Sequence, residues 1–78
     1  MSHTPHDLAE MMPDQAEAIH RRKAEDTHFA RVAARYDEIN RAIHRAESDL
    51  EPTDDFHMQE MRKQRLALLD EIRGLLAA

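Results

Sequence analysis

The residues that could do chemistry in this chain are six histidines and a few carboxylate and hydroxyl side chains. His3 and His6 lie near the N-terminus, where a free amine followed by histidine can chelate copper or nickel. Removal of the initiator methionine, which the small Ser2 favours, would destroy that spacing. The other histidines form no i, i+4 ligand pair, and the chain has no cysteine. We therefore expect surface histidines without a bound metal or cofactor, and a metal-handling role for His3 and His6 is only a third hypothesis.

Catalytic groupings are also scarce. A hydrolytic nucleophile needs a Ser, Cys or Thr held beside a base, but the serines here are Ser2, at the terminus, and Ser48, in a predicted turn. Asp54 and Asp55 resemble an acid–base pair, yet carboxylates at the start of a helix are typical of helix caps. The single glycine, Gly74, cannot build a phosphate-binding loop. The sequence therefore predicts a protein that is not an enzyme.

Two basic clusters, at residues 21–23 and 62–65, are the remaining charged features. Either cluster could contact nucleic-acid phosphates. Both are flanked by acidic residues, and neither cluster contains an aromatic side chain that could serve as a platform for bases. We interpret them first as the polar faces of helices.

Hydrophobic periodicity supplies the frame that must position these residues. Between residues 29 and 50, apolar or small side chains recur in steps of three and four, which is the seam of a helix packed along another helix. Asp26 or Thr27 can cap this helix, and Pro52 cannot continue it. The seam comprises Phe29, Val32, Tyr36, Ile39, Ile43, Ala46 and Leu50.

A second helix, from about Asp54 to Leu76, repeats the same rhythm. The turn near residues 48–55 is short, so the helices should pack antiparallel, with facing positions whose numbers sum to about 104. Arg65 then falls opposite Ile39, and its head group should lie near Glu38 or Asn40. The predicted hairpin core is Phe29, Val32, Tyr36, Ile39, Ile43, Met58, Met61, Leu68, Ile72 and Leu75.

Residues 1–26 are predicted to form an amphipathic lead-in to the hairpin of residues 27–78. Thr4 and Pro5 are typical of a helix start, and Pro13 should end that helix and open another. The whole chain is thus expected to be all-α.

The last helix presents more apolar surface than one partner helix can cover, because Leu66, Leu69 and Leu76 widen its stripe. Either the lead-in folds back over them, or two hairpins associate as a helical bundle. Because an isolated hairpin of this size is marginally stable, association is favoured. Leu66, Leu69 and Leu76 are therefore the candidate interface.

Composition favours binding over chemistry. The net charge is −5, and the 35% of residues that are charged have interleaved signs, as on solvated helix faces. No secretory or membrane-length apolar run is present, so we expect a cytoplasmic protein with no membrane partner. The leading hypothesis is a protein–protein interaction module that forms homo-oligomers or binds a larger protein. The alternative is a nucleic-acid-binding regulator or RNA chaperone that uses both basic clusters.

The run FARVAARYDEINRAIHRAESDLEPTDD, followed by MRKQRLALLDEI, resembles the YdcH-like family of small bacterial proteins, a family of unknown function. The N-terminal HDLAEMMPDQAEAIHRRK is similar to the lead-in of its longer members. Leu69 departs from the family pattern, which usually has lysine there. The resemblance implies a cytoplasmic helical hairpin, and it implies no activity, substrate, cofactor or functional residue.

Overall fold

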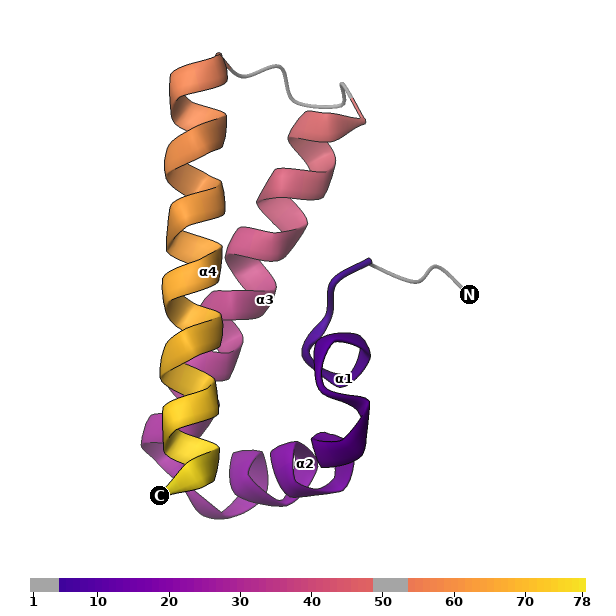
Figure 1. Ribbon diagram of the computed structural model, residues 1–78, viewed down its shortest axis with the longest axis vertical. Coiled ribbons are helices and arrows are strands. Elements are labelled where there is room, and N and C mark those ends of the chain that lie inside the picture. The colour runs from indigo at the N-terminus through magenta and orange to yellow at the C-terminus, as the bar shows by residue number, and fades with distance from the viewer. Residues whose placement is uncertain (1–4, 49–53) are drawn as a thin grey trace.

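The structure is a computed structural model that describes residues 5–48 and 54–78, and the chain it describes is all-α. The lead-in contains α1 (Leu8–Met11), a 3₁₀ turn (Pro13–Gln15) and α2 (Ala16–Glu25). The hairpin consists of α3 (Thr27–Glu47) and α4 (Asp55–Ala77), which run antiparallel (Figure 1). The predicted fold class is therefore confirmed.

Aspartate caps start both helices of the hairpin. The Asp26 carboxylate accepts a hydrogen bond of 3.2 Å from the Phe29 N–H, and Asp54 accepts one of 2.6 Å from the His57 N–H. Each cap satisfies a backbone donor that has no partner within the first turn of its helix. The predicted starts of the hairpin helices are thus confirmed.

The core lies along the α3–α4 seam in two clusters. One contains Phe29, Val32, Ala33, Tyr36, Leu69 and Ile72 from the hairpin, with Leu68, Leu75 and Leu76 packed against it. The other contains Ile43, Ala46 and Met61, with Ile39, Ala42 and Met58 beside it. Leu50, which the heptad pattern includes in the seam, lies outside the described residues, as does the centre of the turn at 49–53.

Polar contacts across the hairpin fix the register of the two helices. Arg65 Nη1 donates a 2.9 Å hydrogen bond to Asn40 Oδ1, and Arg62 Nη2 lies 3.1 Å from Glu47 Oε2. The Arg65 contact confirms the predicted position of its head group near Asn40. The residue numbers of this pair sum to 105, close to the predicted 104, whereas those of Arg62 and Glu47 sum to 109, about one helical turn further along.

The lead-in folds back against the hairpin, as Figure 1 shows for α1 and α2. Leu8, Met12 and Ile19 are buried in the same cluster as Phe29 and Leu69. The fold-back that the sequence disfavoured is thus observed: these three side chains lie in the cluster that buries Leu69, while Leu66 stays exposed.

The start of the lead-in differs from the prediction. Pro5 does not open a helix: α1 begins at Leu8, and its N-cap is Asp7, whose carboxylate accepts a 2.8 Å hydrogen bond from the Glu10 N–H. Thr4 lies outside the described residues. Pro5 and His6 instead form a turn whose carbonyls face α3.

Candidate interaction surfaces

Three polar side chains of α3 bind the turn that precedes α1. Tyr36, Asn40 and His44 are spaced by four residues and so share one flank of the helix. Tyr36 Oη donates to the His6 carbonyl at 2.5 Å, and Asn40 Nδ2 donates to the Pro5 carbonyl at 2.8 Å. His44 Nε2 also lies 2.8 Å from the Pro5 oxygen. This ladder ties the lead-in to one flank of the hairpin.

Asn40 joins three segments of the chain at one buried amide. Its side chain donates to Pro5, at the start of the lead-in, and accepts from Arg65 of α4. The residue is 1% exposed, so each of these contacts replaces water that cannot reach the amide. Sequence reasoning treated Asn40 only as a possible partner of Arg65 and missed its bond to Pro5.

His6 and His44 stack at the end of the ladder. Their ring centroids are 5.6 Å apart with an interplanar angle of 18°, and His44 Nδ1 lies 3.1 Å from Glu47 Oε1. His3, the other residue of the proposed copper or nickel pair, lies outside the described residues. Across residues 5–48 and 54–78, no three histidine, aspartate or glutamate side chains converge closely enough to hold a metal ion.

Burial changes the chemistry of Tyr36. Loss of water around the phenol raises the pKa of Tyr36 above its ordinary value of 10.0, and the nearby positive charge of Arg65 opposes that rise. The folded chain therefore favours the protonated phenol, which is the form that donates to the His6 carbonyl.

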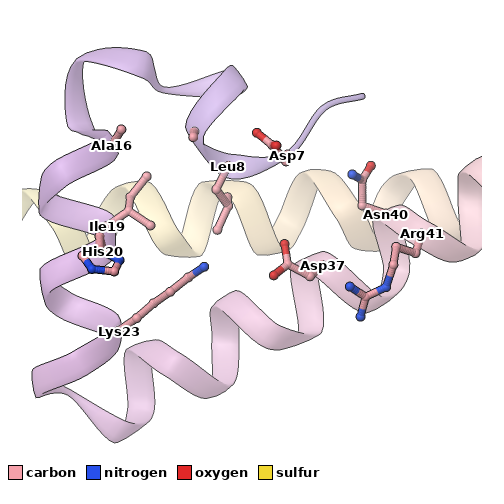
Figure 2. A pocket seen from close by; sticks show the side chains of 10 residues that line it. Asp7, Leu8, Ala16, Ile19, His20, Lys23, Asp37, Asn40 and Arg41 are labelled. Carbon is pink, nitrogen blue, oxygen red and sulfur yellow. The ribbon is translucent and has the colours of Figure 1, made fainter. Parts of the chain in front are cut away.

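A crevice of about 460 Å³ lies between the lead-in and α3 (Figure 2). Its floor includes Leu8 and Ile19, which belong to the core. Side chains of both signs line it, and Figure 2 shows Lys23 extending from α2 between the two segments, on the same side as Asp37. Mixed charge over a floor of core side chains indicates a packing seam rather than a site for one charged ligand.

An apolar groove of about 500 Å³ lies between α3 and α4. Its apolar lining consists of Ile39 and Ala42 from α3 and Ala67 and Leu68 from α4. Helical spacing places these residues on the flank of the hairpin opposite to the ladder that holds the lead-in. The lead-in therefore covers one flank of the hairpin and leaves the other open.

Polar side chains border this groove on both helices. The border comprises Arg35, Glu38 and Arg45 from α3 and Gln64 from α4. In the described part of the chain, Arg35 makes neither a hydrogen bond nor an ion pair. The groove thus combines an apolar floor with a cation that has no ion pair among residues 5–48 and 54–78.

The three leucines proposed as an interface are in three different environments. Leu69 is only 5% exposed and lies in the core, and Leu76 is half-buried against it. Leu66 is 57% exposed and lines a small crevice beside Met11 of the lead-in. The expectation of a continuous uncovered ridge is therefore wrong at Leu69, because the lead-in covers it.

The residues of the open groove were largely missed by sequence reasoning. Ile39 and Leu68 were assigned to the hairpin core, and Ala42 and Ala67 were given no role. The sequence did contain a signal for this groove: on each of the two facing helices an alanine lies close to a large apolar residue. Small side chains at such positions leave space along the flank of a helix pair.

Cations of the two basic clusters make contacts within the chain. Arg22 donates to the Leu75 carbonyl and stacks its guanidinium over the Phe29 ring at 5.7 Å. Arg62 pairs with Glu47, and Arg65 binds Asn40. These contacts fix α2 and α3 against α4 and weigh against a shared role in binding phosphate.

Comparison with known families finds a match over the hairpin. A family described as Protein of unknown function (DUF465) matches residues 29–76, which span nearly all of α3 and α4. The chain therefore belongs to this family, of which the YdcH-like proteins are members. Searches of curated proteins and of solved structures find no match. Of the helices in the described residues, none combines the length and apolar character needed to cross a membrane.

Proposed function

We propose that this chain is a protein–protein interaction module that binds a helical protein surface in the groove between α3 and α4. The observation that carries this proposal is the open flank of the hairpin, where Ile39, Ala42, Ala67 and Leu68 form an apolar floor. A helix packed into such a groove gains stability by removing apolar surface from water.

The side chains around the floor support a protein partner over a small molecule. The groove runs between two long helices and is bordered by charged and amide groups rather than by convergent catalytic ones. An apolar centre with a polar rim is the usual anatomy of a protein interface. We also propose that this association takes place in the cytoplasm.

A photo-crosslinking residue placed at Gln64, on the edge of the groove, tests the proposal. Asp70 is the matched control, because it is exposed on the same helix but lies outside the groove lining. We expect a crosslinked protein at position 64 and none at position 70 when the full chain is irradiated in its native cell. No protein crosslink at position 64, or equal crosslinking at both positions, would refute the proposal.

A further inference from the structure

We infer that the protein seated in the α3–α4 groove is a second copy of this chain, packed so that α3 of each copy lies against α4 of the other. This inference rests on the proposed function and names its partner. Three features of the hairpin support it: the charges on the two sides of the groove, the register of the helices and the area of the open face.

The α3 side of the groove is basic. Arg31, Arg35, Glu38, Ala42 and Arg45 follow helical spacing along one stripe of α3. Three of these five groups are arginines and one is a glutamate. The groove lining includes Arg35, Glu38, Ala42 and Arg45 from this stripe, so the basic groups border the apolar floor.

The α4 side is acidic and carries an exposed aromatic ring. Phe56, Glu60, Gln64, Ala67 and Glu71 follow the corresponding stripe of α4. This stripe contains two glutamates, of which Glu60 lies 3.8 Å from the exposed Lys63 on the same helix, and Phe56 is 72% exposed. Phe56 follows the same stripe as Gln64 and Ala67 of the groove lining, and an exposed phenylalanine on such a stripe is typical of an association surface.

A two-fold axis parallel to the helices matches these stripes. Rotation about such an axis keeps every residue at its level along the bundle and places α3 opposite α4 of the second copy. Arg35 then faces the second copy's Glu71, and Arg45 faces its Glu60, because each pair has almost the same index sum as the contact of Asn40 with Arg65. An axis across the helices would instead bring the two basic stripes together, which like-charge repulsion opposes.

The surface is large enough for a stable dimer. α4 has 23 residues and is therefore about 34 Å long, and two adjacent helices are about 20 Å across. The open face thus measures roughly 700 Å², close to the roughly 800 Å² per partner of a stable interface. Two copies would form a four-helix bundle from their hairpins, with each lead-in on the outside.

Charge reversal at one predicted pair tests this arrangement by sedimentation over a dilution series of the full chain. We expect the unchanged protein to form dimers, and Arg35→Glu or Glu71→Arg alone to weaken dimerisation about tenfold or more, since symmetry places each change at two contacts. The double variant R35E/E71R should recover dimerisation. It should not pair with the unchanged protein, because in a mixed dimer the two side chains that face each other at positions 35 and 71 would carry charges of the same sign at both contacts.

The control is the variant D70R/R73E. Asp70 and Arg73 form an i, i+3 pair at 3.8 Å on α4, away from the groove lining, and the reversed pair keeps the net charge. It should dimerise like the unchanged protein, and circular dichroism should show every variant to be helical. The existing contact of His28 with Glu71 is long, at 3.8 Å, and exposed, so its loss perturbs the fold little.

The outcomes separate this inference from the proposed function. A protein that is monomeric at high micromolar concentration, or a double variant that does not recover, overturns the second copy as the partner. If a different protein crosslinks at Gln64 under those conditions, the proposed function stands and this inference alone fails. A dimer that neither Arg35→Glu nor Glu71→Arg alone weakens also overturns the arrangement.

Discussion

Replacing Asn40 by alanine should loosen the lead-in and lower the free energy of unfolding. The change removes one hydrogen bond to the Pro5 carbonyl and one from the Arg65 guanidinium. A neutral hydrogen bond contributes about 1 kcal/mol and one to a charged group about 1.5–3 kcal/mol. Pro5 is exposed and Arg65 is half-buried, so water can hydrogen-bond to the Pro5 carbonyl and the Arg65 guanidinium once the amide is removed, which offsets part of the lost free energy. We therefore expect a loss of about 2–3 kcal/mol.

That loss is large for a chain of 78 residues. At about 0.05–0.15 kcal/mol per residue, the total stability is of order 4–12 kcal/mol. Urea unfolding followed by far-ultraviolet circular dichroism measures the change. Tyr36 is the single tyrosine and the chain has no tryptophan, so intrinsic fluorescence reports on the ladder at the same time.

The matched variant Asn40→Asp separates the two contacts. Aspartate keeps an acceptor for Arg65 but cannot donate to the Pro5 carbonyl. We expect it to release the lead-in, so that trypsin cuts after Arg21 and Arg22 faster than in the unchanged protein, while the hairpin stays helical. An Asn40→Ala stability within 0.5 kcal/mol of the unchanged protein, or slow cleavage in Asn40→Asp, would refute this account of the ladder.

Three further predictions follow from single sites. Tyr36→Phe should cost about 1 kcal/mol through its lost bond to His6. Burial raises the pKa of Tyr36 in the folded chain, so the stability that its phenol contributes is complete below the ordinary pKa of 10.0 and is lost as the pH rises through the folded value. The absorbance of the phenolate at 295 nm should therefore titrate with a midpoint above 10.0. A midpoint at or below 10.0 would contradict this prediction. Leu69→Ala should cost about 2–5 kcal/mol and Leu66→Ala less than about 0.5 kcal/mol in denaturant melts, and equal costs would mean that the lead-in does not cover Leu69. Gly74→Ala should raise stability by up to about 1 kcal/mol, since no atom lies within 4 Å of the added Cβ, and a lower melting temperature would show that the position is crowded.

The hairpin was predictable because its information is local. Steps of three and four place Phe29, Tyr36 and Ile43 on one face of a helix whatever surrounds it. Aspartates directly before the apolar runs mark the helix starts in the same way. The register then followed from a short loop, and it placed Arg65 near Asn40 correctly.

The lead-in was harder to predict because its partners are backbone carbonyls. Tyr36, Asn40 and His44 bind the oxygens of Pro5 and His6, and every residue carries such an oxygen, so the sequence does not mark the acceptor. The signal that was present, polar side chains spaced by four beside the seam, is shared by any solvated helix. Without knowledge of this docking, the sequence prediction left Leu69 uncovered and assigned it to the candidate interface, whereas the structure buries it beside the lead-in.

In the proposed dimer the two flanks of the hairpin have separate roles, and this separation has a measurable consequence. The ladder at Asn40 holds the lead-in on one flank, while Arg35 borders the groove on the other, and the two side chains share no hydrogen-bond partner. Effects of residues without shared contacts add to within about 0.5 kcal/mol. The free energy of dimerisation lost in Arg35→Glu should therefore be the same whether or not Asn40→Asp has released the lead-in. A strong dependence would mean that the lead-in itself contributes to the dimer, and that the groove is not an independent binding surface.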